Sequence, residues 1–241
     1  MTVNLDRNPI AGSPISAIVP AFQAAAEIAS VVESLAGELD KLKRNYEVLV
    51  IDDASTDNTA ARAEELTKRF PKLRLVRNEA SLGYGPTLSK GIATAQHPLL
   101  FAFPADGSVK ATALPKMLAA IDEVDIVCGV RQPHPGGAAR NVGWLAYFLF
   151  GLWLHDVSCP VRLYRRTVFD RLPIQSKGTF AEVEILAKAN FLESLMVEVE
   201  VEWQATAASK WPSVGGDARR LFLYPKFIYS AKSEQAPQAT T

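Results

Sequence analysis

The sequence predicts an α/β fold with a Rossmann-like, mostly parallel sheet and helices on both faces. Short β-rich segments alternate with helical segments from Ile15 to about Val130, which is the pattern of successive βαβ units. Between the first two β-rich segments, apolar residues recur at three- and four-residue spacing from Ile28 to Leu42, as on one face of a helix. With 241 residues, of which 48% are hydrophobic, the chain can bury a large core.

The expected elements follow from this alternation. Five strands are predicted in the first half, at 15–20, 46–51, 73–77, 99–103 and 124–130. Four helical crossovers separate them, at 24–43, 60–70, 86–96 and around 114–121. The second half is predicted to hold a Pro/Gly loop at 132–139, an apolar helix at 143–154, a basic strand at 160–166, a helix at 179–189 and a strand at 196–203.

Charge and cysteine content exclude several classes of protein. The 26 basic and 26 acidic residues give a net charge of zero, which argues against nucleic acid as a partner. Cys128 lies in an apolar run and Cys159 is the only other cysteine, so we expect free thiols in a reducing compartment. Residues 1–14 lack the pattern of a secretory signal, and we expect a cytoplasmic protein.

Two segments suggest contact with a membrane surface. The apolar run at 143–154 is shorter than the roughly 20 residues that span a bilayer as a helix. The tail after Gly215 combines aromatic residues with Arg219, Arg220 and Lys226. We therefore expect peripheral attachment at the inner face of the membrane.

Polar residues follow the predicted strands in a regular way. In open α/β sheets, ligands bind beyond the carboxyl ends of the strands. Asp52 and Asp53 follow the second strand, and Asp106 follows the fourth. Asp57 is explained more simply as part of a helix start. Capping explains less for Asp52 and Asp53, because adjacent carboxylates at a strand end repel each other unless a ligand, a base edge or a cation satisfies them.

Four motifs then resemble those of inverting family 2 glycosyltransferases: VPAFQ at 19–23, VIDDASTDNT at 50–59, LGYGPTLSKG at 82–91 and ADGS at 105–108. The continuation at 129–151, 155–166, 180–189 and 208–210 is similar to the dolichyl/polyprenyl-phosphate sugar synthase branch. The resemblance covers about residues 15–211. It implies a glycosyltransferase-A type of fold, with an N-terminal extension at 1–14, a nucleotide-binding half to about 130, an acceptor half after it, and an amphipathic, partly disordered tail at 212–241.

The resemblance also implies roles for individual residues. Nucleotide contacts would come from Pro20, Phe22, Asp52, Asp53, Gly83 and Gly85. Catalytic roles would fall to Asp106, Arg131 and Arg162, with Asp106 also a ligand of Mg²⁺ or Mn²⁺. The acceptor phosphate would contact Arg140, Ser209 and Lys210. On this basis, substitution of Arg131 or Arg162 is expected to reduce turnover more than stability.

Two departures from the family pattern weaken the expected metal site. Pro104 stands where the family usually has an acid two residues before Asp106, and Ala24 stands where an acid usually follows the first strand. A cation that bridges a diphosphate can draw most of its ligands from water and phosphate oxygens. One carboxylate can therefore suffice.

The resemblance implies transfer of a sugar, with inversion, from a nucleoside diphosphate sugar to a polyprenyl phosphate or another lipid-like acceptor. A lipid phosphate is already ionised near neutral pH and needs no general base. One alternative is a glycosyltransferase acting on a sugar hydroxyl, with Glu182 or Glu184 as base, although a partly exposed helix is the simpler interpretation of these residues. Another, motivated by Pro104, is a catalytically silent sugar-nucleotide-binding subunit.

Overall fold

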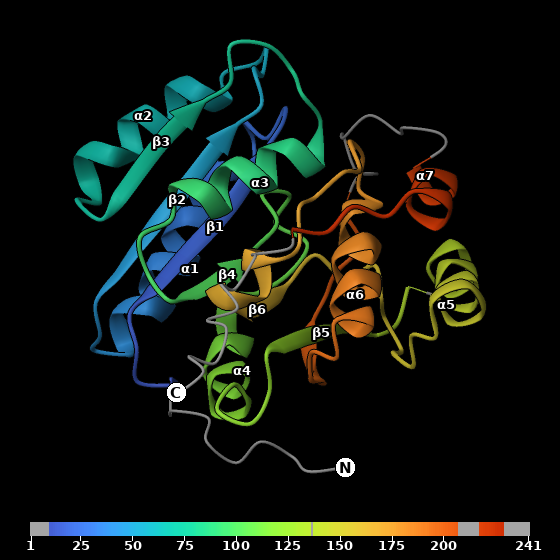
Figure 1. The fold of residues 1–241 in the computed structure, drawn as a ribbon. Helices are drawn as coiled ribbons and strands as arrows, with labels where there is room; N and C mark the ends of the chain where they lie inside the picture. Colours follow the sequence, from blue (N-terminus) through green and yellow to red (C-terminus); the bar gives the residue numbers. More distant parts are fainter. Residues whose placement is uncertain (1–9, 136, 207–216, 229–241) are drawn as a thin grey trace, which may run out of the picture.

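The structure, a computed structural model, describes residues 10–135, 137–206 and 217–228. Its strands form one seven-stranded sheet in the order β3-β2-β1-β4-β6-β5-β7 (Figure 1). The strands are β1 (Ile15–Ala21), β2 (Tyr46–Asp52), β3 (Leu73–Arg77), β4 (Leu99–Ala102), β5 (Ile126–Gln132), β6 (Arg162–Arg165) and β7 (Met196–Glu202). The α-helices are α1 (Ile28–Lys41), α2 (Thr59–Arg69), α3 (Tyr84–Thr94), α4 (Leu114–Ala120), α5 (Gly137–Phe150), α6 (Ala181–Phe191) and α7 (Asp217–Leu223).

The sheet is mostly parallel, as predicted. β1 pairs in parallel with β2 and β4, and β2 pairs in parallel with β3. β6 is the exception, because it lies antiparallel between β4 and β5, while β7 is parallel to β5. All strands except β6 therefore point the same way, and their carboxyl ends meet at one edge of the sheet.

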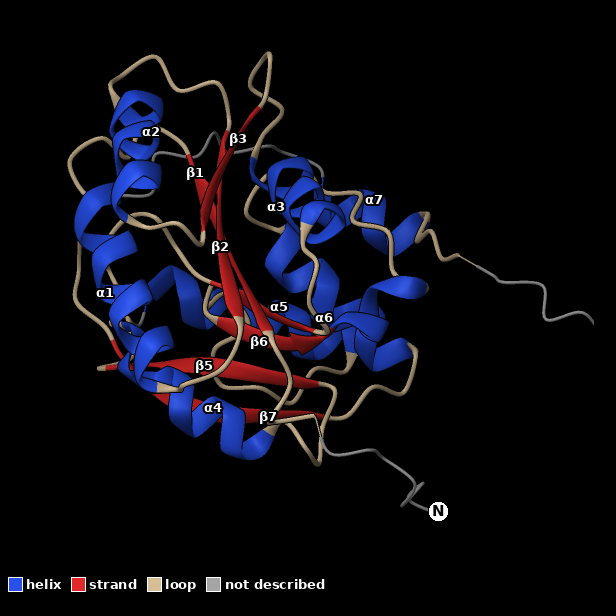
Figure 2. Cartoon of the chain, turned by 90° about the vertical axis from the view of Figure 1, so that its left-hand side faces the viewer, coloured by secondary structure: helices blue, strands red, loops and turns tan. Residues whose placement is uncertain are grey.

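Two apolar cores lie on the two faces of the sheet. Alternate residues of β1 face opposite sides, since Ile15, Ala17 and Val19 pack in one core and Ile18 packs in the other. Helices α1, α2 and α4 cover the first face, and α3, α5 and α6 cover the second. Figure 2 shows this arrangement edge-on, with α1 and α2 on one side of the strands and α3 and α6 on the other.

The predicted strands are confirmed within a few residues, and two helices differ in their bounds. α1 begins at Ile28 rather than near Ala24, because residues 24–27 form a turn in which Glu27 N donates to Ala24 O. α5 covers Gly137–Phe150 instead of 143–154, and Gly151 follows it with φ +64°, the backbone conformation that commonly ends a helix.

Both cysteines are buried free thiols, as expected, and burial raises the pKa of each to about 12. Parts of the predicted N-terminal extension and tail, together with Ser209 and Lys210, fall outside the described residues.

Candidate functional site

The candidate site lies where β1, β2 and β4 end. Ala21 is in register with Asp52, so the residues after β1 lie beside those after β2. The pairing continues past the strands, because Asp53 N donates to Ala21 O and Phe103 N donates to Ile18 O. Pro20 in β1 and Phe22 just after it are thereby placed next to the two aspartates, and their nucleotide contacts stay predictions.

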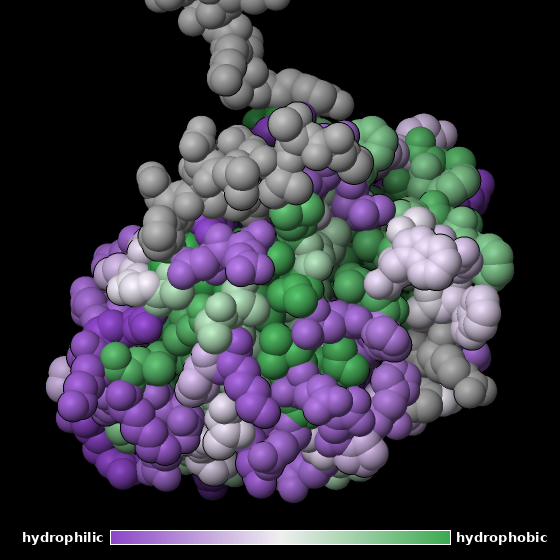
Figure 3. Space-filling view, turned by 90° about the horizontal axis from the view of Figure 1, so that it is seen from below, coloured by the Kyte–Doolittle hydropathy of each residue, from purple (hydrophilic) through white to green (hydrophobic). Residues whose placement is uncertain are grey.

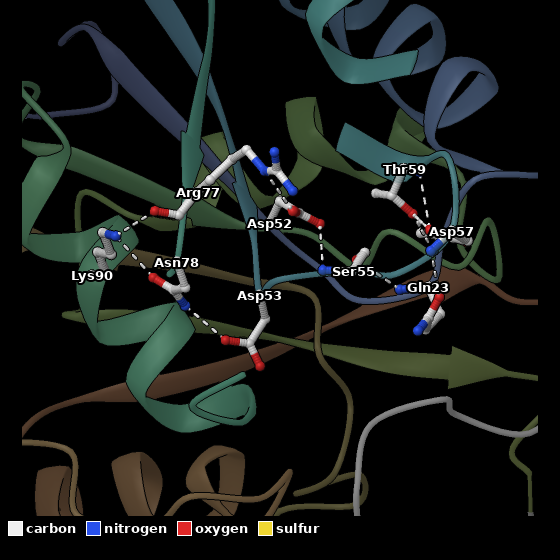
Figure 4. Close-up of polar contacts among 10 residues, drawn as sticks. Gln23, Asp52, Asp53, Ser55, Asp57, Thr59, Arg77, Asn78 and Lys90 are labelled. Atoms are coloured by element: carbon white, nitrogen blue, oxygen red, sulfur yellow. Dashed lines mark hydrogen bonds and ion pairs between the residues drawn. The ribbon is translucent and has the colours of Figure 1, made fainter. Parts of the chain in front are cut away.

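Asp52 is fully buried, and its two carboxylate oxygens have different partners (Figure 4). Oδ2 lies 3.2 Å from Arg77 Nε, and Oδ1 accepts a hydrogen bond from Ser55 N at 3.4 Å. The Arg77 side chain is 57% exposed, so it presents a cation at the end of β3 beside Asp52. Arg77 was not anticipated, although a basic residue at the end of a strand adjacent to Asp52 was a usable signal.

Asp53 holds the loop that leads to α3. Its carboxylate accepts hydrogen bonds from Leu82 N (2.9 Å), Asn78 Nδ2 (2.7 Å), Gly83 N (2.9 Å) and Ser81 Oγ (2.9 Å). Burial would raise the pKa of Asp53, but these four donors outweigh it and keep the pKa below its ordinary value. Asp53 therefore positions this loop, and its nucleotide contact stays a prediction.

Asp57 fastens the loop after β1 to the start of α2 (Figure 4). Its carboxylate accepts hydrogen bonds from Thr59 N at 3.0 Å and from Ala25 N at 3.1 Å. Gln23 joins the same cluster, since its Nε2 donates to Thr56 Oγ1 at 2.7 Å. These contacts agree with the structural interpretation of Asp57.

Gly83 and Gly85 allow a close approach, but to another segment of this chain. A Cβ on Gly85 would lie 1.9 Å from Ser176 O, and a Cβ on Gly83 would lie 2.4 Å from Lys177 O. Gly85 N also donates to Lys177 O at 3.2 Å, and Gly83 has φ +94°. The packing of α3 against residues 176–177 thus explains both glycines without a ligand.

We expect Gly85→Ala to lower the free energy of unfolding by about 1–3 kcal/mol, because the added methyl group overlaps a main-chain oxygen. Urea denaturation measures the change. Gly37→Ala is the matched control, since Gly37 lies within α1 with nothing within 4 Å of the added Cβ, and it is expected to stabilise by up to about 1 kcal/mol. Equal stability of Gly85→Ala and wild type would contradict the close approach.

Asp106 lies in a tight turn after β4. Its Oδ1 accepts a hydrogen bond from Ser108 N at 2.9 Å, and Gly107 has φ +68°. A Cβ on Gly107 would lie 3.8 Å from Cβ and Cγ of Glu27, so a second acidic residue borders the turn.

Within the described residues, no group of three or more His, Cys, Asp or Glu side chains could hold a metal ion. The turn therefore fits a cation only if phosphate and water oxygens supply most of its ligands beside Asp106.

Arg131 lies at the end of β5 and forms a two-pronged ion pair with Asp156. Its Nε and Nη2 lie 2.7 Å from the two Asp156 oxygens, and Nη2 also donates to Ser158 Oγ at 2.7 Å. Burial would raise the pKa of Asp156, but the contact with Arg131 holds it below its ordinary value. The Arg131 side chain keeps 14% of its surface exposed. Arg140 belongs to α5, but its side chain lies outside what the structure describes.

The structure does not support the catalytic role expected for Arg162. Its side chain has no exposed surface and lies 2.8 Å from Glu182 Oε2. It also donates to the main-chain oxygens of Glu182 and Val157, at 2.5 and 2.6 Å. Tyr84 OH donates to the same Glu182 carboxylate. Arg162 thus ties β6 to α6 inside the core, where a substrate cannot reach it.

Neither glutamate considered as a base is free. Glu182 and Glu184 are 3% and 0% exposed, so the expectation of a partly exposed helix face was wrong. Glu184 accepts hydrogen bonds from Gln175 N and Ser176 N and lies 2.6 Å from Lys188 Nζ. Both carboxylates are bound by their own chain, which leaves the hydroxyl-acceptor alternative without its expected base.

Comparison with known proteins adds the family. The model for Glycosyl transferase family 2 matches residues 16–172. The chain belongs to this family. The glycosyltransferase is 25% identical over 179 residues to dodecaprenyl-phosphate galacturonate synthase of Rhizobium johnstonii. The alignment covers 70% of this chain and 53% of that protein, so this chain spans about half of that relative's length. The glycosyltransferase is 29% identical over 173 residues to polyprenol monophosphomannose synthase of Mycolicibacterium smegmatis, covering 64% of this chain and 65% of that one.

Solved structures confirm the glycosyltransferase-A type of fold. Glucosyl-3-phosphoglycerate synthase from Mycobacterium tuberculosis, in complex with Mn²⁺, UDP and phosphoglyceric acid, superposes with a TM-score of 0.69 at 22% identity. The match covers 83% of this glycosyltransferase and 72% of the synthase.

Proposed function

We propose that this glycosyltransferase transfers a sugar, with inversion, from a nucleoside diphosphate sugar to a polyprenyl phosphate. The observation that carries the proposal is that the carboxylates of Glu182 and Glu184 are bound by Tyr84 and Lys188 of the same chain. A sugar hydroxyl must lose a proton as it attacks, and neither glutamate is available to accept it. A phosphate monoester is largely ionised at neutral pH and attacks without a base. Relatives named as polyprenol-phosphate and dodecaprenyl-phosphate sugar synthases support this choice of acceptor.

The donor would lie at the ends of β1 and β2. Pro20 and Phe22 would border the nucleoside, and the exposed Arg77, which the buried Asp52 holds in place, would contact it from β3. The segment Gly83–Gly85, held by Asp53, would border the donor on the same side as Asp53. Their placement side by side at the carboxyl ends of adjacent strands supports this assignment.

Asp106 would be the protein's ligand to Mg²⁺ or Mn²⁺. A cation at this position, when bound, would neutralise the donor diphosphate and stabilise it as a leaving group. Because Pro104 has no side-chain ligand, Asp106 would supply the single carboxylate of the site. We therefore expect a weaker affinity for the cation than at a site with two carboxylates. The Mn²⁺ found with a structural neighbour supports a divalent cation in this fold.

Arg131 and Arg140, with Ser209 and Lys210, would hold the acceptor phosphate. Arg131 is kept in place by Asp156 and Ser158, which fixes the direction of its guanidinium group. The acceptor oxygen would bond to the anomeric carbon as the bond from that carbon to the diphosphate oxygen breaks. The electron pair leaves with the nucleoside diphosphate, and a single displacement inverts the configuration.

The test is an acceptor comparison. The enzyme is incubated with a panel of nucleoside diphosphate sugars and Mn²⁺, with a polyprenyl phosphate, with the corresponding dephosphorylated polyprenol, or with a sugar acceptor. Mass spectrometry is expected to detect a glycosyl phosphate lipid in the first case alone. Glycosylation of a hydroxyl would favour the alternative acceptor class, and binding of a donor without turnover by any acceptor would favour a silent binding subunit.

A further inference from the structure

Helix α5 is apolar on the side that faces away from the protein. Residues 141–154 contain no charged side chain. Ala146 is buried against the rest of the chain, whereas Trp144 and Phe148 point outward and are 59% and 73% exposed. Beyond the helix, Trp153 is 81% exposed. A helix that is apolar all round needs an apolar partner on both sides, and among the described residues α5 has one only on its inner side.

The exposed apolar area continues beyond α5. Phe191, the last residue of α6, is 72% exposed, and Phe222 of α7 is 56% exposed. Leu149, Phe191 and Phe222 border one groove of about 320 Å³ between α5, α6 and residues 221–227. We call the aromatic surface the set formed by Trp144, Leu145, Phe148, Leu149, Trp153, Phe191, Phe222, Leu223 and Tyr224.

Ring contacts make this surface continuous. Tyr147 packs edge-on against Trp153 at 4.6 Å between ring centroids, and Trp144 stacks on Phe148 at 5.8 Å. Phe150 reaches Phe222 at 6.5 Å and so joins α5 to α7. In Figure 3, green and pale residues gather toward the right-hand side, on which α5 lies in Figure 1.

Charge and residue type indicate what covers this surface. Arg219 and Arg220 are exposed on α7, and Lys226 is exposed just after it. Trp and Tyr favour the interface between water and lipid, where the ring lies in an apolar layer and its polar atom remains hydrated. Basic residues beside an aromatic face are drawn to anionic lipid headgroups.

The length of α5 decides how it would lie. Its 14 residues extend about 21 Å, less than the roughly 30 Å of a bilayer's hydrocarbon layer. Within the described part of the chain, no helix is long and apolar enough to cross a membrane. We propose that the aromatic surface docks on an anionic bilayer, with α5 in the plane of the interface and the groove between α5, α6 and α7 facing the lipid.

The experiment is flotation of the full chain with phosphatidylcholine vesicles, with and without phosphatidylglycerol and without any polyprenyl phosphate. Wild type is expected to float with the anionic vesicles. The variant Phe148→Ser/Trp153→Ser is expected to partition at least tenfold less while retaining a cooperative melting transition, because both side chains are largely exposed. Lys226→Glu is expected to weaken flotation with the anionic vesicles and to leave the result with pure phosphatidylcholine vesicles unchanged.

Lys68→Glu is the matched control for charge, since Lys68 is exposed on α2, which covers the opposite face of the sheet, and it is expected to float like wild type. Wild type left at the bottom of both gradients, or equal flotation of wild type and the double variant, would overturn the proposal. A dimer in solution that the double variant converts to a monomer, without flotation by either, would show that a second copy covers the surface. Because the vesicles contain no acceptor, these outcomes are independent of glycosyl transfer.

Discussion

Arg162→Met is expected to lower the free energy of unfolding by about 3–5 kcal/mol, because it leaves the Glu182 carboxylate buried without its counterion. The guanidinium group also supplies hydrogen bonds to Val157 O and Glu182 O, which lose their donor. Urea denaturation at neutral pH measures the loss.

The double variant Arg162→Met/Glu182→Gln separates charge from packing. Glutamine removes the unpaired charge and retains an oxygen that accepts the hydrogen bond from Tyr84. We expect the double variant to be more stable than Arg162→Met alone. If Arg162→Met instead matched wild type in stability and lost turnover, the catalytic role first expected for Arg162 would be restored.

Arg131→Ala is expected to reduce kcat/KM of the folded enzyme by about 10²–10³-fold, because a fixed guanidinium group at the end of β5 would no longer contact a phosphate in the transition state. It is also expected to lower the free energy of unfolding, since it leaves the buried Asp156 carboxylate without its counterion. Arg131→Lys is expected to recover only part of the activity, since an ammonium group lacks the planar fork that pairs with Asp156. Rates are measured over a range of acceptor concentrations, so that binding and turnover are resolved.

Arg166→Ala is the control for loss of an arginine without loss of a site residue. Arg166 donates to the main-chain oxygens of His97, Ile92 and Ala95, near the amino end of β4 and away from the carboxyl ends of the strands. Its removal is expected to lower stability and leave kcat/KM of the folded enzyme unchanged. Activity of Arg131→Ala equal to that of Arg166→Ala would assign Arg131 a structural role only.

The positions of the strands in the sequence were predictable because each strand is a short apolar run between polar turns, as in Tyr46–Asp52. The meeting of Asp52, Asp53 and Asp106 at one edge followed from the parallel arrangement. The insertion of β6 between β4 and β5 was not predictable, because pairing between residues 99–102, 126–128 and 162–165 depends on contacts distant in sequence.

The buried charges account for the main error about the site. Charged side chains in a sequence favour exposure, and nothing local to Arg162 or Glu182 indicates that each is the other's partner. The contacts that Asp53 makes with its own chain were not predictable either, since its four donors come from a loop 25–30 residues later in the chain. Arg77 was visible in the sequence, but its contact with Asp52 depends on the pairing of β2 with β3.

We expect the ends of β1, β2 and β4 to bind a nucleoside diphosphate sugar together with a divalent cation at Asp106. Calorimetric titration with a panel of these donors, in Mn²⁺ or in chelator, tests it most directly, with Asp170→Asn as the control because Asp170 is an exposed residue of the turn after β6. Wild type and Asp170→Asn are expected to bind one donor at least tenfold more tightly with Mn²⁺, about 1.4 kcal/mol, and Asp106→Asn is expected to lose this gain. Wild-type donor affinity that is the same in Mn²⁺ and in chelator, or a gain with Mn²⁺ that persists in Asp106→Asn, would contradict this expectation.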